Sequence, residues 1–315
     1  MLITNLIFMI LSCFTLVKSS SFLVRSLAKI SEYFRMNEFA IGFIIMAVST
    51  SLPELFVGIT AAIDNATALA LGAVIGSNIL DLTLVIGIVT LMARGIKIKS
   101  KIIRRDIVYM LGMVILPMLL MWDSVISRID GLVLLAVFLF YIWQMVRQER
   151  SFSRKLEKVQ RAEVLFWIIV AIVSVILLVF SAEFVVEFAT RLSIDLLLPP
   201  ILIGLFIIAL GTSLPELIFE SKAVLERHEE LALGDLLGSV ITNSTLVLGV
   251  TALIRPITAN LLLFFSSAMF MVLIAFVFMT FAESEKGISW KEAVSLILLY
   301  MFFIVMESYI KFLKG

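Results

Sequence analysis

The sequence predicts an all-α membrane protein with ten transmembrane helices, arranged as two inverted five-helix repeats. Hydrophobic residues make up 62% of the 315 residues and charged residues make up 16%, whereas a typical soluble domain is about 25% charged. The mean hydropathy is +1.14, and apolar runs long enough to cross about 30 Å of hydrocarbon recur along the whole chain. A polar motif within these runs also occurs twice, 162 residues apart. These observations indicate that the solvent of this chain is a lipid bilayer.

The apolar runs predict the individual helices in order along the chain. We place the ten spans at residues 2–17, 38–63, 69–93, 107–122, 130–147, 164–182, 200–221, 231–254, 260–281 and 289–310. No Lys or Arg precedes the first span, whereas Lys18, Arg25 and Lys29 follow it. A cleaved signal peptide has the reverse order of charge, so we expect a retained helix with its N-terminus outside. The stretches 19–36 and 183–196 mix apolar and charged residues, and we expect them to lie along the membrane interface.

Basic side chains test this placement, because the cytoplasmic segments of membrane proteins carry an excess of Lys and Arg. With the N-terminus outside, 20 of the 25 Lys and Arg residues fall on the cytoplasmic side. This distribution agrees with ten spans and predicts that both termini lie outside a cell membrane. The longest polar segment then divides the chain into a first repeat at residues 1–146, a cytoplasmic linker at 147–162 and a second repeat at 163–315.

The internal repeat is visible as a polar motif and its surroundings. The segment Ala47–Leu55 reappears as Ala209–Leu217, and both copies contain Thr-Ser-Leu-Pro-Glu-Leu. The same offset pairs glycines further along each half, such as Gly76 with Gly238. Each half holds five predicted helices, an odd number, so the two halves must have opposite orientations. Inverted repeats whose broken helices meet at the membrane midplane are an architecture of transporters.

Each copy of the motif combines a proline with a carboxylate inside an apolar segment. Pro53 and Pro215 have no amide proton, so a carbonyl one turn earlier lacks its helical partner. An unsatisfied carbonyl is costly in hydrocarbon, and a bound cation can satisfy it. A proline kink alone would be the simpler interpretation. However, Glu54 and Glu216 follow the prolines directly, and buried carboxylates in membrane segments are usually functional.

The next predicted helix of each half carries a second polar pair. Ser77 and Asp81 are spaced i, i+4 in the first half, and Ser239 and Asn243 repeat that spacing in the second. Each pair therefore shares one helix face, and the second pair lies roughly 12 to 18 Å into its helix, near the middle of the membrane. Together with the motifs, these helices supply oxygen donors only, which Ca²⁺ and Na⁺ prefer and soft metals do not. The donors are Glu54, Glu216, Asp81, Asn243, Thr50, Ser51, Thr212, Ser213, Ser77 and Ser239.

The paired motifs, each followed by Gly-Ser and by Asp or Asn four residues after that serine, resemble the α-repeats of the calcium/cation antiporter superfamily. The resemblance covers essentially the whole chain and is closest to small prokaryotic sodium/calcium exchangers. It implies ten helices in two inverted sets of five and an exchange of Ca²⁺ for Na⁺, with no cofactor besides the transported ions. The ligands that it implies are the carbonyls of Ala47 and Ala209 and the side chains of Thr50, Ser51, Glu54, Ser77, Asp81, Thr212, Ser213, Glu216, Ser239 and Asn243.

Several positions depart from the pattern of this family. The acidic member of the last pair usually lies in the second half, whereas here Asp81 is in the first half and Asn243 in the second. The number of carboxylates stays at three, which preserves the charge balance for a divalent ion. Ser49 replaces an expected Gly, and Ala73 and Asp235 replace expected Asn residues.

Two further acids have no acidic counterpart in the first half. Glu220 and Asp235 correspond to Gly58 and Ala73 at the offset of 162. With the predicted orientation, both acids lie on the cytoplasmic side of the site. They can be interpreted as an acidic vestibule that concentrates cations, or as solvated residues near helix ends.

The sequence therefore predicts a secondary antiporter, and no enzyme, that exchanges Ca²⁺ for Na⁺ by alternating access with Glu54 and Glu216 as shared ligands. Proton-coupled members of the superfamily usually carry an acid where Ser77 and Ser239 stand, which favours Na⁺ as the coupling ion. Coupling to H⁺ or K⁺, or another divalent substrate, is the alternative, because neighbouring carboxylates bind protons more readily. The inverted repeat and the many oxygen donors disfavour a channel or an intramembrane hydrolase. The net charge of +1 argues against a nucleic-acid partner, and we expect a monomeric transport unit in the lipid bilayer.

Overall fold

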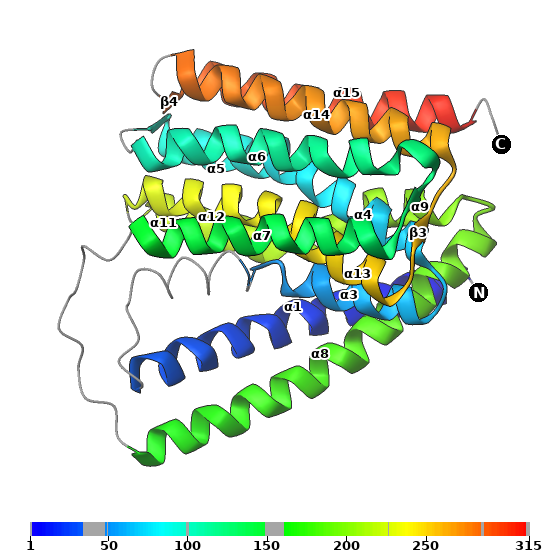
Figure 1. Cartoon of the computed structure of the whole chain (residues 1–315), viewed down its shortest axis with the longest axis horizontal. Coiled ribbons are helices and arrows are strands. Elements are labelled where there is room, and N and C mark those ends of the chain that lie inside the picture. The colour runs from blue at the N-terminus through cyan, green and yellow to red at the C-terminus, as the bar shows by residue number, and fades with distance from the viewer. Residues whose placement is uncertain are drawn as a thin grey trace.

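The computed structural model describes residues 2–33, 48, 50–98, 101–148, 161–225, 227–284 and 287–312. These residues form a helical bundle with two short strand pairs (Figure 1). The first half contains α1 (Leu2–Tyr33), α3 (Leu52–Ile63), α4 (Thr67–Leu80), η1 (Asp81–Val85), α5 (Ile86–Ala93), β1 (Ile96–Lys97), α6 (Lys101–Leu120), η2 (Met121–Asp123), β2 (Val125–Ile126) and α7 (Arg128–Gln148). The second half contains α8 (Arg161–Asp195), α9 (Pro200–Ile203), η3 (Gly204–Ile208), α10 (Ala209–Thr212), α11 (Leu214–Leu225), α12 (Glu229–Thr242), η4 (Asn243–Val247), α13 (Leu248–Ile254), β3 (Ile257–Thr258), α14 (Leu261–Ser284), β4 (Gly287–Ile288) and α15 (Trp290–Phe312).

Eight helical segments of the described chain are long and apolar enough to cross a membrane, and a helix can do so because it satisfies its backbone internally. They are Ile3–Leu23, Thr67–Ala93, Ile103–Asp123, Arg128–Met145, Val164–Asp195, Pro200–Leu225, Glu229–Ile254 and Phe264–Ser284. Each overlaps one predicted span. Of the two other predicted spans, 38–63 lies partly outside the described residues and includes α3, and 289–310 corresponds to the helix α15. A multi-pass helical membrane protein is therefore confirmed, whereas the number of ten spans stays a prediction.

The two stretches predicted to lie along the membrane interface continue long helices, so the predicted spans 2–17 and 164–182 end too early as helices. Residues 19–33 belong to α1, which has 32 residues, and residues 183–195 belong to α8, which has 35. At 1.5 Å per residue α8 is about 52 Å long, more than the roughly 30 Å of hydrocarbon. Its charged end can therefore lie beyond the hydrocarbon without a bend in the chain. An ion pair one turn apart, Arg191 Nη2 to Glu187 Oε1 at 2.5 Å, supports the helix there.

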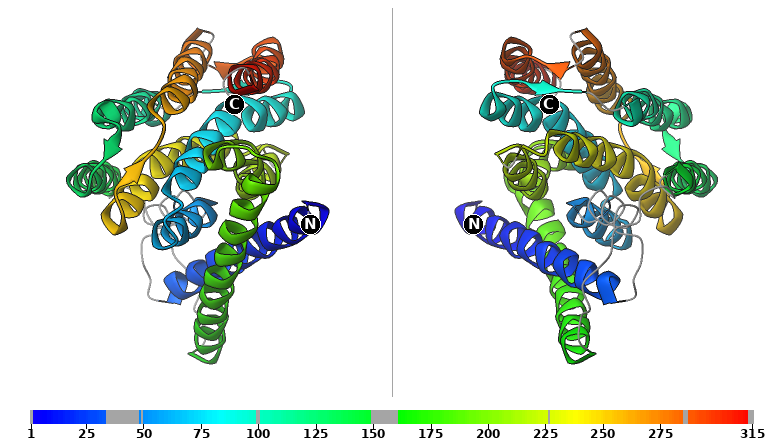
Figure 2. Two further views of the ribbon diagram at one scale, coloured as in Figure 1. Left: turned by 90° about the vertical axis from the view of Figure 1, so that its right-hand side faces the viewer. Right: turned by 90° about the vertical axis from the view of Figure 1, so that its left-hand side faces the viewer.

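The helices pack in two groups with separate cores. α1 and α8 cross each other on one side of the molecule (Figure 2) and share an apolar core with parts of α3, α4 and η3. The larger core lies among α4 to α7 and α11 to α15. α4 and α12, the helices that follow α3 and α11 in the chain, lie between the pair α1 and α8 and the pair α14 and α15 (Figure 1).

Equivalent elements of the two halves have matching bounds. α3 and α11 begin and end 162 residues apart, and so do α4 and α12 and the five-residue π-helices η1 and η4. β1 pairs with β4 and β2 pairs with β3, so each strand pair joins one strand from each half. The two strand pairs lie at opposite ends of the bundle (Figure 1).

Small residues hold α4 of the first half directly against α9 and η3 of the second. A Cβ atom added to Gly72 would lie 2.1 Å from the carbonyl oxygen of Ile201, and one added to Gly204 would lie 2.2 Å from that of Leu69. No side chain fits at such distances, so the two backbones approach as closely as glycine allows. This contact brings the polar residues that follow in both halves next to one another.

Candidate cation-binding site

The structure describes eleven of the twelve predicted ligand residues and buries all of them. Ala47 lies outside the described residues, as does Ser49. The described ligands, each at most 9% exposed, are Thr50, Ser51, Glu54, Ser77, Asp81, Ala209, Thr212, Ser213, Glu216, Ser239 and Asn243. Thus the eleven described residues of the predicted set lie inside the protein rather than facing lipid or water.

A helix begins directly after the conserved Thr-Ser in each half. Ser51 has φ −80° and ψ 5°, and Ser213 has φ −83° and ψ 6°, so both lie outside helical geometry. Pro53 and Pro215 are the second residues of α3 and α11, where the missing amide proton costs no hydrogen bond. The proline therefore starts a new helix instead of kinking a continuous one. The glutamate that follows lies in the first turn of that helix.

Hydroxyl groups connect the two halves across the site. Thr50 Oγ1 lies 2.8 Å from Ser239 Oγ, and the equivalent pair, Ser77 Oγ and Thr212 Oγ1, lies 3.3 Å apart. Ser77 Oγ also donates to Glu54 Oε1 at 3.0 Å. The motif of each half therefore faces the helix after the motif of the other half, as a site shared between repeats requires.

Most of the remaining oxygen atoms at this point have no hydrogen-bond partner. They include one carboxylate oxygen of Glu54, both oxygens of Asp81 and Glu216, the amide of Asn243, and the hydroxyls of Ser51 and Ser213. Glu216 lies within electrostatic reach of the carboxylates of Glu54, Asp81 and Asp235. No Lys or Arg is buried among the residues whose side chains the structure describes. Buried carboxylates without a positive partner are strongly unfavourable, so this arrangement is suited to a cation.

The chemistry of the donors favours a hard cation held by mixed ligands. Within the described ranges, no three carboxylate, His or Cys side chains come together closely enough to hold an ion alone. Hydroxyl, amide and carbonyl oxygens must therefore complete any coordination shell. Ca²⁺ takes six to eight oxygen ligands of such mixed kinds, and the described site supplies no nitrogen or sulfur ligand that would select a softer metal.

Two π-helical turns begin at the residues predicted as the last ligands. η1 starts at Asp81 and η4 at Asn243, and such turns are frequent at functional sites. Thr83 Oγ1 donates to the carbonyl of Ile79 at 2.5 Å, and Thr245 Oγ1 donates to that of Ile241 at 2.6 Å. Sequence reasoning missed these turns. The threonine that recurs at the offset of 162 was the available signal, because its hydroxyl can serve a carbonyl of the preceding turn.

Asn78 is a further polar residue that sequence reasoning missed. Its Nδ2 donates to Ser244 Oγ at 2.8 Å, which joins the first half to the second. Its Oδ1 is buried without a partner. A polar residue in an apolar helix, directly after Ser77, was the signal that could have found it.

Glu220 and Asp235 are neither solvated nor exposed in a vestibule. Glu220 is fully buried and Asp235 is 2% exposed. Asp235 Oδ1 accepts a hydrogen bond from Thr50 Oγ1 at 3.3 Å. The expectation of an open acidic vestibule is therefore wrong for this structure, because α11 and α12 pack these acids inward beside the predicted ligands.

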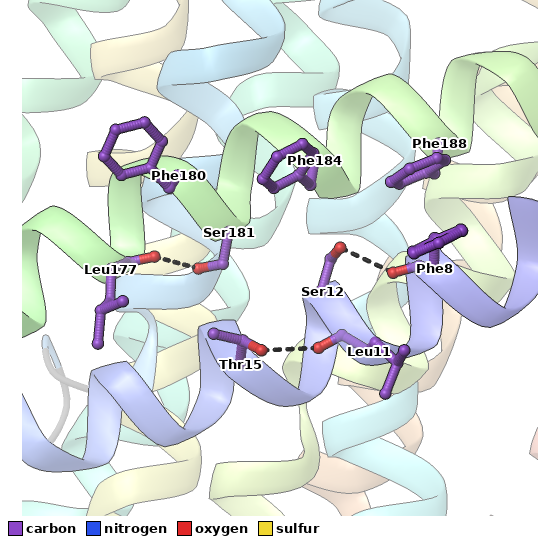
Figure 3. Close-up of a pocket in the computed structure, with 9 residues that line it drawn as sticks. All are labelled: Phe8, Leu11, Ser12, Thr15, Leu177, Phe180, Ser181, Phe184 and Phe188. Carbon is purple, nitrogen blue, oxygen red and sulfur yellow. Dashed lines mark hydrogen bonds between the residues drawn. The ribbon is translucent and has the colours of Figure 1, made fainter.

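A surface groove between α1 and α8 is separate from this site. It has a volume of 390 Å³ and is lined mainly by aromatic and aliphatic side chains, among them Phe8, Phe184 and Phe188 (Figure 3). Its hydroxyl groups donate to carbonyls of their own helices, as Ser12 does to Phe8 and Ser181 to Leu177. The groove therefore offers no cluster of free oxygen donors for a cation.

Comparison with known proteins gives a family match over both halves. The family model described as sodium/calcium exchanger protein matches residues 4–147 and again residues 166–309. The two matches begin and end 162 residues apart. The family comparison thus finds the same duplication as the sequence and the structure.

Individual relatives match along nearly the whole chain. The inner membrane protein YrbG of Escherichia coli (strain K12) is 30% identical over 291 residues, which cover 88% of this chain and 86% of that protein. The sodium/calcium exchanger MaX1 of Methanosarcina acetivorans is 26% identical, and the alignment covers 98% of this chain and 100% of MaX1. A solved structure of the sodium-calcium exchanger NCX_Mj, soaked with 2.5 mM Na⁺ and 10 mM Sr²⁺, superimposes with a TM-score of 0.69 at 26% identity. That superposition covers 97% of this chain and 99% of NCX_Mj.

Proposed function

Because the chain belongs to the sodium/calcium exchanger protein family, we propose that it exchanges Ca²⁺ for Na⁺ across a cell membrane by alternating access. It is a multi-pass membrane antiporter rather than an enzyme. Ca²⁺ and Na⁺ are its proposed substrates, and the proposed site needs no resident cofactor.

One observation carries the proposal: buried oxygen atoms from both halves meet without partners and without a positive side chain. Glu54 and Glu216 lie at the starts of α3 and α11, and Ser77 and Thr212 meet between them across the halves. A site built from both halves opens to one side when the halves tilt one way and to the other side when they tilt back. Ca²⁺ and Na⁺ would compete for the same carboxylates. Each ion could therefore bind and cross only after the other has left the site.

The proposal includes ten transmembrane helices in two inverted five-helix repeats, at residues 1–146 and 163–315. The element bounds that recur at an offset of 162 support it, and so do the strand pairs β1–β4 and β2–β3 at opposite ends of the bundle. Equivalent elements must lie at opposite ends if one half is turned over relative to the other. With 20 of 25 basic residues on one side, we further propose that residues 147–162 are cytoplasmic and both termini are outside. We propose a monomeric transport unit, because both halves of the site come from one chain.

Sodium is the proposed coupling ion because hydroxyl groups occupy the positions of Ser77 and Ser239. Both hydroxyls make hydrogen bonds across the site. A serine hydroxyl can coordinate Na⁺, but it does not take up and release a proton near neutral pH as a buried carboxylate can. Coupling to H⁺ or K⁺ is the alternative that the experiment must separate.

Flux through proteoliposomes tests the proposal. The full-length chain is reconstituted in vesicles loaded with Na⁺, and uptake of ⁴⁵Ca²⁺ is followed after dilution into medium free of Na⁺. We expect uptake that depends on the outward Na⁺ gradient and is absent from vesicles without protein. Outward H⁺ or K⁺ gradients at equal Na⁺ should not drive uptake. Uptake driven by either of these gradients, and not by Na⁺, would show that the coupling ion is wrong.

A further inference from the structure

The second half contains a pair of buried acids that the exchange site does not use. Glu220 in α11 is fully buried and neither of its carboxylate oxygens has a hydrogen-bond partner. Asp235 in α12 is 2% exposed, and its Oδ2 also has no partner. Glu220 lies within electrostatic reach of Asp235 and Asp81. These two acids therefore form a second group of unsatisfied oxygens beside the first.

Asp235 joins this pair to the exchange site through one hydroxyl. Thr50 Oγ1 lies 3.3 Å from Asp235 Oδ1 and 2.8 Å from Ser239 Oγ. The hydroxyl of Thr50 thus lies between the acidic pair and a proposed ligand of the exchanged ion. An ion beside Asp235 would share this hydroxyl with the exchange site.

In the first half, the positions equivalent to Glu220 and Asp235 are occupied by small residues in tightly packed surroundings. A Cβ atom added to Gly58, the counterpart of Glu220, would lie 2.6 Å from Thr251 Oγ1 and 3.3 Å from Val247 Cγ1. Ala73, the counterpart of Asp235, is 2% exposed and belongs to the apolar core that α1 and α8 share with α3 and α4. A glutamate at position 58 would collide with Thr251, and Ala73 carries no charge, so the pair of acids belongs to the second half alone.

Charge balance shows that the pair needs added positive charge, as a bound cation, bound protons or both. One Ca²⁺ bound by Glu54, Asp81 and Glu216 leaves one negative charge, and two more carboxylates leave three. The described residues supply no buried Lys or Arg to offset them. Uncompensated charge of this size is strongly disfavoured in a membrane interior. A second Ca²⁺ would need six to eight oxygen ligands and would repel the first across a short distance.

We propose that Glu220 and Asp235, with the hydroxyl of Thr50, form an accessory site for one monovalent hard cation of the Na⁺ class beside the exchange site. The ion is retained while Ca²⁺ occupies the exchange site. This inference rests on the proposed exchange site for its neighbour but concerns different carboxylates. The site is on the second-half side only, so it has no copy in the first half.

Equilibrium binding of ²²Na⁺ and ⁴⁵Ca²⁺ to the purified full-length chain in lipid nanodiscs tests this site. The variant is Glu220→Gln with Asp235→Asn, which keeps the size of both side chains and removes their charge. At saturating Ca²⁺ we expect the wild-type chain to retain one Na⁺ and the variant to retain none, while both bind Ca²⁺ equally in number. Glu307→Gln is the matched control. Glu307 is also a buried carboxylate, but it bonds to Ser266 and Ser267 between α14 and α15, so its variant should retain the Na⁺.

Other outcomes separate this inference from the proposed function. Equal Na⁺ retention by the wild-type chain and the double variant would overturn the accessory site, and so would a wild-type chain that releases all Na⁺ when Ca²⁺ binds. If the wild-type chain bound no Ca²⁺, the exchange site would be wrong. The accessory site would then be tested by ²²Na⁺ binding alone. The double variant should bind one Na⁺ fewer than the wild-type chain. Retained Ca²⁺ binding, or an unchanged thermal unfolding midpoint, shows that the variant is folded.

Discussion

The two halves of the site have nearly the same backbone conformation but carry different numbers of acidic side chains. Ser51 and Ser213 have nearly the same φ and ψ, and the helices that follow them have the same length. Yet the second half carries Glu220 and Asp235 where the first half has a glycine and an alanine. Duplication therefore preserved where each side chain is attached, while local packing decided which side chains fit. The exchange site has to be explained by what the halves share, and the accessory site by where they differ.

A second difference concerns the two conserved glutamates. Glu54 Oε1 accepts a hydrogen bond from Ser77, whereas neither oxygen of Glu216 has a partner. Both serines contact the threonine of the other half, Ser77 with Thr212 and Ser239 with Thr50, and Thr50 also contacts Asp235. The two halves therefore differ in which carboxylates these hydroxyl groups contact.

The equivalence of the two halves is tested most strongly by Glu54 and Glu216. We expect Glu54→Ala and Glu216→Ala each to reduce Na⁺-dependent ⁴⁵Ca²⁺ uptake to the level of empty vesicles, because each removes a charged ligand that no neighbour can replace. Glu307→Gln, measured in the same assay, should keep the wild-type rate. Clear exchange by either alanine variant would show that the halves do not contribute equivalent ligands.

The exchanged positions of Asp81 and Asn243 give a prediction of intermediate size. Asp81→Asn should weaken apparent Ca²⁺ affinity by at least about tenfold, the loss that is typical even for groups behind direct metal ligands. Asp81→Asn combined with Asn243→Asp restores three carboxylates at the exchange site, so we expect it to regain part of the affinity. The concentration dependence of ⁴⁵Ca²⁺ uptake measures both. If the double variant is as weak as the single one, the two positions are not equivalent in coordinating the ion.

The smallest expected effect concerns the contact that holds the halves together. Gly72→Ala should destabilise the protein by about 1–3 kcal/mol, because its Cβ would meet the Ile201 carbonyl oxygen at 2.1 Å. Gly112→Ala in α6 is the matched control, since its Cβ would have no neighbour within 4 Å. It should leave stability unchanged or raise it by roughly 0.5–1 kcal/mol. Thermal unfolding midpoints in the same detergent compare them, and equal midpoints for both variants would contradict the close contact between the halves.

Much of the fold could be predicted from the sequence because lipid and duplication leave direct signals. Eight predicted spans coincide with helices long and apolar enough to cross a membrane, since hydrocarbon requires long apolar runs. The offset of 162 also predicted the duplication, which agrees with the matching bounds of α3 with α11 and of α4 with α12. The ends of the first and sixth helices were placed too early, because charged residues such as Glu187 and Arg191 were treated as breaks. Within a helix as long as α8 they pair along its surface and leave the helix intact.

The candidate site could be predicted in its members but not in its contacts. Thr50, Glu54 and Ser77 were identifiable from the repeated motif, and the structure buries them together. Their partners in the other half could not be identified, because no periodicity within one helix indicates which residue of another helix it meets. The π-helices at Asp81 and Asn243 were also missed, because the recurring Thr83 and Thr245 mark these turns only indirectly, through a hydroxyl that serves a carbonyl of the preceding turn.

From the amino-acid sequence alone it follows that this protein spans a membrane, that it is duplicated, and which oxygen-bearing residues each copy carries. These properties follow from composition and from identity at a fixed offset, which need no knowledge of distance. The contacts of Thr50 with Ser239 and Asp235, and the burial of Glu220, became visible only in the folded protein. They depend on how closely the two halves pack through glycines such as Gly72 and Gly204. This packing involves two surfaces at once, so it cannot be inferred from either segment alone.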